Sequence, residues 1–243
     1  MKYFALLTAI FLTVNIFAQE ENTKKDIDFS VGGSFVSSYL WRGIKLANAS
    51  IQPEMELSAW DFKLGAWGSV DLIGSFKEAD LYANYTFSGL TVGVLDCYIP
   101  SSENNENWFD FSKKTTEHLL EAELHYTFKP FPLTIGWNTM FFGPDKVLNE
   151  KTEKEEQVFS SYIEAAYEFE IKETTLSLEI GATPWRSSGL VYGEEITKFA
   201  VLDVSIMASK EIKITDNYAM PAFARFSVSP EFKDVHFVFG IKF

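Results

Sequence analysis

Polar and apolar side chains alternate along most of this sequence, and the alternation constrains its fold more than any other feature. In residues 117–128, Leu120 and Leu124 fall on one side of an extended chain, whereas Glu121 and Glu123 fall on the other. A period of two residues indicates a β-strand that has one face in apolar surroundings. We find about 12 such runs, each with about the ten residues that a tilted strand needs to cross a membrane. The runs cover residues 29–41, 51–60, 62–72, 78–87, 90–99, 117–128, 133–142, 158–170, 174–185, 197–209, 218–228 and 234–243. The pattern predicts an all-β fold, a single antiparallel transmembrane β-barrel of about 12 strands.

The connections between these runs alternate in length. Short turns follow runs that end near Phe87 and Phe128, whereas long polar segments cover 100–116 and 143–157. Short turns at one end and long polar loops at the other are typical of outer-membrane barrels, in which the short turns face the periplasm. One turn, near 210–217, is expected to be longer than the others on its side.

Aromatic residues recur near the ends of the runs. Tyr85, Tyr126 and Tyr167 are spaced 41 residues apart, and each lies two residues before a phenylalanine. A period of this size can indicate propeller blades, but a blade has four short strands and this period holds two long ones. The core of a β-sandwich would not concentrate its rings at strand ends, whereas a membrane barrel carries aromatic girdles at both interfaces. The expected periplasmic girdle is Tyr85, Phe87, Tyr126, Phe128, Tyr167, Phe169 and Phe243, and the opposite rim is Tyr39, Trp41, Tyr98, Phe141 and Trp185.

The first 18 residues have the pattern of a secretory signal peptide. Lys2 is followed by a mostly apolar stretch from Phe4 to Phe17, which is too short for a spanning helix, and Ala18 is the expected cleavage position. We therefore expect a signal peptide over 1–18, a short segment over 19–28 and a barrel over 29–243, exported to the outer membrane of a Gram-negative cell.

Composition excludes several other classes. The chain has 21 Lys and Arg against 34 Asp and Glu, and its net charge of -13 argues against nucleic acid as a partner. The single cysteine cannot form an internal disulfide, and no Cys/His cluster has the spacing of a zinc site. We expect no cofactor and no metal.

The last run, 234–243, carries five apolar residues on one face. It resembles the C-terminal strand of Gram-negative outer-membrane barrels, in which alternating apolar residues and a terminal phenylalanine are recognised by the barrel-assembly machinery. The residues of this run that carry the resemblance are Phe239, Ile241 and Phe243. The resemblance implies the assembly machinery and outer-membrane lipids as partners.

A more specific resemblance lies near the expected mature start. The segment Ser38-Tyr39-Leu40-Trp41-Arg42-Gly43-Ile44 is similar to the S-x-Y-x-[WF]-R-G signature of the TorF-type putative porin family. The resemblance implies an outer-membrane, pore-like barrel, and no catalytic residues come with it. From the residues alone, Arg42 and Gly43 are expected to end the first strand, because glycine readily adopts a positive φ. Arg42 is expected to form a structural ion pair with a carboxylate.

One face of the predicted strands is rich in acidic residues. A lumen lined by one sign of charge concentrates the opposite ion, so we expect a cation-preferring pore. In the alternative, these charges pair with one another and side chains fill the lumen, since twelve strands lie between a filled eight-stranded barrel and an open porin. The lumen candidates are Glu54, Glu56, Asp71, Asp80, Glu121, Glu123, His125, Glu164, Glu168, Glu179, Asp203 and Arg225, with Lys63 and Lys242 as the other basic residues.

Metal binding and lipid modification are the two alternatives to a lumen lining for these residues. Glu121, Glu123 and His125 share one strand face and carry metal-ligating groups, but alternate residues on a strand lie about 7 Å apart, so lumen lining is favoured. A lipid-modifying enzyme needs a serine next to a histidine, and His118 and His125 have no such neighbour on their faces. We therefore expect no enzyme activity.

The function favoured by the sequence is passive diffusion of small polar solutes or cations through an outer-membrane porin-like barrel. The alternatives are a non-conducting barrel that acts as a structural, adhesion or binding protein through its loops, and an outer-membrane lipid-modifying enzyme.

Overall fold

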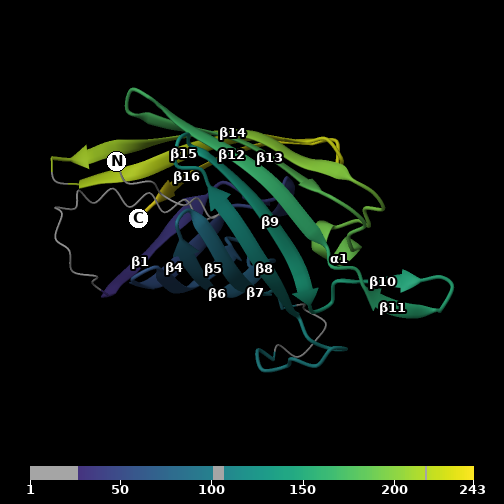
Figure 1. The fold of residues 1–243 in the computed structure, drawn as a ribbon. Coiled ribbons are helices and arrows are strands. Elements are labelled where there is room, and N and C mark those ends of the chain that lie inside the picture. The colour runs from purple at the N-terminus through teal and green to yellow at the C-terminus, as the bar shows by residue number, and fades with distance from the viewer. Residues whose placement is uncertain (1–26, 101–106, 217) are drawn as a thin grey trace.

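Twelve strands form a closed antiparallel barrel in the computed structural model, which describes residues 27–100, 107–216 and 218–243 (Figure 1). The predicted signal peptide and most of the 19–28 segment lie outside these residues. The all-β fold, the closed barrel and the number of strands are confirmed. The barrel strands are β1 (Ile27–Val36), β4 (Ser50–Ala59), β5 (Phe62–Asp71), β6 (Lys77–Phe87), β7 (Leu90–Tyr98), β8 (His118–Thr127), β9 (Leu133–Phe142), β12 (Ser161–Ile171), β13 (Thr174–Thr183), β14 (Ala200–Thr215), β15 (Tyr218–Ser229) and β16 (Asp234–Lys242).

The barrel is closed by pairing of its first and last strands. Phe35 of β1 pairs with Ile241 of β16, and Gly33 exchanges two backbone hydrogen bonds with Phe243. Closure leaves neither strand with a free edge, and an unpaired edge is not tolerated in the hydrocarbon of a membrane. Among the described residues, no helix is long and apolar enough to cross a membrane.

The two ends of the barrel differ in their connections. At one end, short turns join β4 to β5, β6 to β7, β8 to β9 and β12 to β13, and at the other end long segments join β7 to β8, β9 to β12 and β13 to β14. The β10–β11 hairpin (Lys146–Asn149 and Lys154–Gln157) projects beyond the long-loop end, and the β14–β15 hairpin extends from the opposite end (Figure 1). The expectation of a long turn near 210–217 is wrong, because β14 continues to Thr215 and the residues expected to form a loop extend this strand.

The alternation along each strand has apolar residues outside and polar residues inside. On β8, Leu124 is 49% exposed and Tyr126 is 38% exposed, whereas Glu121, Glu123 and His125 are buried toward the lumen. This pattern is the reverse of a water-soluble protein, which buries its apolar face. Contiguous apolar area of this kind marks a surface that meets an apolar environment.

The first predicted run does not stay in the barrel wall. Strand β1 ends at Val36, and the chain then forms a separate hairpin of β2 (Tyr39–Trp41) and β3 (Ile44–Ala47). The expectation that Arg42 and Gly43 end the first strand is therefore wrong. Both have positive φ, 48° and 80°, which is the geometry of a tight two-residue hairpin turn.

The hairpin also changes the expected outer rim. Phe141 and Trp185 are exposed on the outside as predicted, but Tyr39 is buried, Trp41 packs against the core inside the barrel, and Tyr98 is buried beneath a loop. A bend at residues 37–38 turns the chain away from the wall, so Tyr39 and Trp41 lie inside the barrel and not at its rim. The residues of the expected periplasmic girdle do lie at the short-turn end, where Tyr85, Phe87 and Phe243 are exposed.

Candidate functional site

The β2–β3 hairpin crosses the lumen from one wall to the opposite one. It leaves the wall between β1 and β4, and β8 lies on the far side of the closed strand order. At its tip, the Arg42 guanidinium donates two hydrogen bonds of 2.8 Å to the two carboxylate oxygens of Glu121 on β8. This is the ion pair with a carboxylate that the sequence favoured, and both side chains are buried. A bidentate pair fixes direction as well as distance, so it anchors the hairpin across the lumen.

Aromatic rings surround the same guanidinium. Its central carbon lies 4.5 Å from the ring centroid of Trp41 and 4.6 Å from that of Tyr162. Trp41 in turn stacks on Tyr192, with ring centroids 5.8 Å apart. Cation–π contacts of this kind stabilise a charge that has left water.

The turn itself fits closely against β14. A Cβ atom at position 43 would lie 2.1 Å from the carbonyl oxygen of Leu202, which also accepts a hydrogen bond from the Ser229 hydroxyl. Position 43 therefore favours glycine for two independent reasons, its positive φ and the lack of space for a Cβ atom. The Trp41-Arg42-Gly43 part of the motif is explained by this packing, because each residue is used to dock the hairpin.

A second segment folds into the same end of the barrel. The connection between β13 and β14 carries the one-turn helix α1 (Gly189–Tyr192), and Tyr192 and Ile196 are buried against wall residues Met140 and Leu202. We call residues 39–47 and 184–199 together the plug, although Trp185, at the start of the second segment, lies on the outside of the barrel. The plug and the wall residues that it contacts form an apolar core inside the barrel at the long-loop end.

The lumen at the short-turn end is more polar and partly exposed. Lys63 bonds to Glu56 at 2.8 Å, and the Tyr82 hydroxyl donates to Glu56 at 3.0 Å and approaches Glu54 at 3.3 Å. We call this region the open half, and its charged residues are Glu54, Glu56, Lys63, Glu168 and Lys242.

Between plug and open half, Arg225 forms a further ion-paired cluster on the lumen wall. Its guanidinium lies 2.5 Å from Asp203 and 2.9 Å from Glu179, and Asp203 also accepts a hydrogen bond from Ser227. The positive charge of Arg225 therefore compensates the carboxylates of Asp203 and Glu179, and neither is a free lumenal charge.

The remaining candidates have separate surroundings. His125 bonds to Asn138 at 2.9 Å and lies 3.6 Å from Glu164, whereas Glu121 is held by Arg42, so the face of β8 is not one metal site. Asp71 was expected to line the lumen, but its carboxylate accepts hydrogen bonds from Ser75 and Phe76 and stabilises the turn after β5.

Sequence reasoning missed Glu78, Cys97, Tyr162 and Tyr192, which are all buried inside the barrel. Glu78 has the same parity as Asp80 and was available from the alternation. The other three become significant only through contacts between distant segments.

The histidines have partners other than serine hydroxyls. His118 lies on the outward face of β8, yet it is fully buried because the loop after residue 107 covers it. Its Nδ1 lies 2.8 Å from Asp96, its Nε2 lies 2.8 Å from the Trp108 carbonyl oxygen, and Phe111 stacks on its ring at 4.2 Å. His236 approaches Asp234 at 3.5 Å. The contacts of His118 hold the loop after residue 107 against β8.

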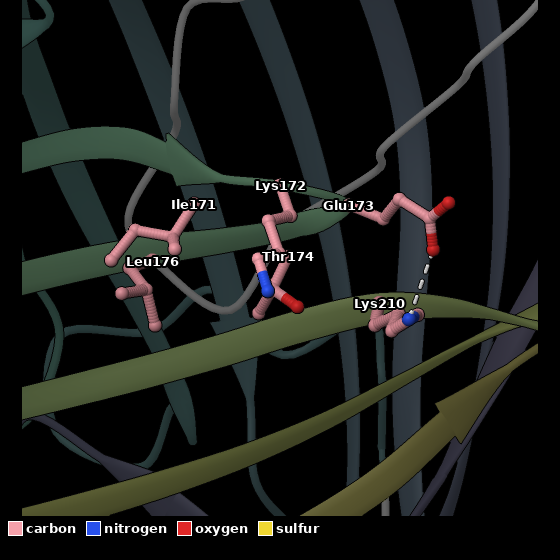
Figure 2. Close-up of a pocket in the computed structure, with 6 residues that line it drawn as sticks. All are labelled: Ile171, Lys172, Glu173, Thr174, Leu176 and Lys210. Atoms are coloured by element: carbon pink, nitrogen blue, oxygen red, sulfur yellow. Dashed lines mark ion pairs between the residues drawn. The ribbon is translucent and has the colours of Figure 1, made fainter.

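A surface pocket of about 550 Å³ lies outside the lumen at the short-turn end, between the β12–β13 turn and β14 (Figure 2). Its one ion pair joins Lys210 and Glu173 at 3.0 Å, and both side chains are largely exposed (Figure 2). The lining residues are Ile171, Lys172, Glu173, Thr174, Leu176 and Lys210.

Comparison with known proteins finds one family and two solved structures to which the chain is similar. No curated protein matches the sequence. A family described as a bacterial protein of unknown function (Gcw_chp) matches residues 20–210.

Among solved structures, a porin refined at 1.8 Å resolution is 14% identical over 81% of this chain, with a TM-score of 0.34, and the chain spans 62% of that porin. Salmonella typhi OmpF in complex with daunomycin is 9% identical over 89% of this chain and 97% of its own, with a TM-score of 0.38. The TorF-type resemblance is not confirmed and stays a prediction.

Proposed function

We propose that this chain, which belongs to the Gcw_chp family of bacterial proteins, is a porin-like outer-membrane barrel through which small polar solutes, and cations more readily than anions, diffuse passively. The observation that carries the proposal is the combination of an apolar exterior with partly exposed carboxylates in the open half of the lumen. An apolar exterior suits lipid, and an acidic interior suits cations.

Several features support the outer membrane as the location. The barrel strands are 9 to 16 residues long, which suffices for tilted strands in a bilayer. The family match begins at residue 20, just after the predicted cleavage position Ala18. The exposed side chains of Phe239 on β16 and of Phe243 directly after it are available to outer-membrane lipids and to the barrel-assembly machinery.

Cation preference follows from the charges in the open half. Three carboxylates, Glu54, Glu56 and Glu168, stand against the two amines of Lys63 and Lys242. Arg225 adds no free positive charge, because it is paired with Asp203 and Glu179. The excess of negative charge raises the local concentration of cations.

The plug makes the proposed channel a gated one. Arg42 and Glu121 hold the hairpin across the lumen, so conduction requires the hairpin and the 184–199 segment to move aside. In this proposal the described conformation is the closed state.

The same plug favours a second candidate, a non-conducting barrel that works as a structural, adhesion or binding protein through its loops. A lumen packed with buried apolar side chains gives the barrel rigidity without a pore. The third alternative, a lipid-modifying enzyme, lacks a supporting observation, because the contacts of His118, His125 and His236 do not include a serine hydroxyl among the described residues.

The test is a planar-bilayer recording of the refolded mature protein under a salt gradient. We expect infrequent step openings with a reversal potential that indicates cation preference. An anion-preferring reversal potential would contradict the charge argument. Silence in both the wild type and a plug-deleted variant would favour the non-conducting barrel, and lipid analysis after incubation with outer-membrane lipids checks the enzyme alternative.

A further inference from the structure

Three metal-ligating side chains meet on the lumen wall beneath the plug. Glu78 and Asp80 lie two residues apart on β6, and Cys97 is paired directly with Asp80 on β7. Their relative exposures are 7%, 5% and 7%, and one oxygen of each carboxylate and the Cys97 Sγ all lie within 4.8 Å of one another.

Part of this cluster has no partner in the described structure. Glu78 Oε2 and Asp80 Oδ1 are buried oxygens without a hydrogen-bond partner. Burying a carboxylate away from water is unfavourable unless it is compensated, and two carboxylates side by side also repel each other. Both unsatisfied oxygens are explained if a cation binds between them.

We infer that Glu78, Asp80 and Cys97 bind a divalent transition-metal ion, for which Zn²⁺ has the best-matched chemistry. Zn²⁺ accepts cysteine sulfur and carboxylate oxygen together, at about 2.3 and 2.0 Å. Mg²⁺ and Ca²⁺ select oxygen ligands alone, and Cu⁺ selects sulfur ligands. Ligands of a tetrahedral Zn²⁺ lie about 3.5 Å apart, so a small rotation of these side chains brings the three atoms into place.

The site connects the wall with the plug. The Tyr39 hydroxyl, on the β2–β3 hairpin, is a hydrogen-bond partner of Glu78, and the Tyr39 ring packs on Trp67 of β5 at 5.4 Å. An ion held by Glu78, Asp80 and Cys97 is therefore placed under the hairpin, where it orders the residues that contact Tyr39. The site does not depend on conduction, and a non-conducting barrel would hold the ion equally well.

The experiment is Zn²⁺ titration of the untagged, refolded protein in detergent, with binding followed by competition against a chromophoric chelator. We expect one equivalent of Zn²⁺ to bind, and we expect Cys97→Ser and Asp80→Asn each to weaken binding at least about tenfold, the loss that even removal of an outer-shell partner produces. Glu155→Gln, on the exposed β11 strand, is the control and leaves binding unchanged.

Folding of each variant is checked by its heat-modifiable mobility in gels. Co²⁺ provides a second readout, because a thiolate ligand gives a near-ultraviolet charge-transfer band in the wild type that is absent from Cys97→Ser. Should both variants fail to fold, the Co²⁺ spectrum of the wild type decides, and a spectrum without the thiolate band overturns the proposal. Failure of the wild type to take up Zn²⁺, or uptake that persists in both folded variants, also overturns it.

Discussion

The plugged end and the open half of this lumen are built from the same twelve strands. Charged side chains are buried and paired at the plugged end, whereas they are partly exposed to solvent in the open half. At the plugged end, Arg42 and Glu121 are buried and bound to each other at 2.8 Å. In the open half, Glu54 and Glu56 keep contact with solvent and are only partly compensated by Lys63. The comparison teaches that inward alternation alone decides which side chains face the lumen, whereas the inserted segments decide which of them are buried.

Removing the hairpin tests this contrast most severely. Replacement of residues 39–47 by a short Gly-Ser turn takes away the segment that spans the lumen, and the barrel strands remain paired. We expect the variant to open far more often than the wild type, with single-channel currents still limited by the 184–199 segment, which stays in place. The matched control shortens the β10–β11 hairpin, which projects away from the lumen (Figure 1), and leaves conductance at the wild-type level. Equal currents in both variants would show that the hairpin does not close the lumen.

Arg42→Ala is the next largest change. It leaves Glu121 as a buried, unpaired carboxylate, and breaking a buried pair costs about 3–5 kcal/mol. If this cost falls on plug docking, the open probability rises about 100-fold or more in bilayer recordings, since each 1.4 kcal/mol is a factor of ten. Lys45→Ala changes an exposed side chain of the same hairpin and is expected to leave gating unchanged. An Arg42→Ala channel that opens no more often than Lys45→Ala would contradict the anchoring role of the ion pair.

The double variant Glu54→Gln and Glu56→Gln acts on the open half. We expect the cation-to-anion permeability ratio, measured from reversal potentials, to fall by about threefold, because a partly exposed charge contributes less than about 1 kcal/mol. Glu155→Gln, on a hairpin outside the lumen, serves as the control. Unchanged selectivity in the double variant would show that Glu54 and Glu56 do not determine which ions permeate.

Glu173→Gln is expected to have the smallest effect. Glu173 and Lys210 form an exposed pair at the barrel rim, and such pairs contribute less than about 0.5 kcal/mol. Urea unfolding and conductance are therefore expected to match the wild type. A clear loss of conductance would mean that the pocket in Figure 2 takes part in permeation.

The barrel wall could be predicted from the sequence because its pattern is local. A shift of one residue would turn every apolar side chain of a strand inward, so the alternation also fixes which face of each strand meets the lumen. Glu121 and Glu164 were assigned to the inward face in this way, and both lie there.

The plug could not be predicted because its hairpin has the same alternation as a barrel strand. The alternation therefore predicts one continuous strand over residues 29–41, because no glycine or proline at 37–38 indicates the bend. The Arg42–Glu121 pair joins residues 79 positions apart, and the sequence indicates that Arg42 has a partner without indicating which one. Asp80 and Cys97 meet through strand register, which the alternation does not fix by itself.

Tryptophan quenching by brominated lipid tests the central claim most directly. Two variants each keep one tryptophan, with the other five replaced by phenylalanine: one keeps Trp137, 41% exposed on the outside of β9, and the other keeps Trp67, buried in the lumen against Tyr39. For protein folded in bilayers that contain brominated acyl chains, we predict strong quenching of Trp137 and little quenching of Trp67. Equal quenching of the two, or none for Trp137, would contradict an apolar exterior in contact with lipid around a plugged lumen.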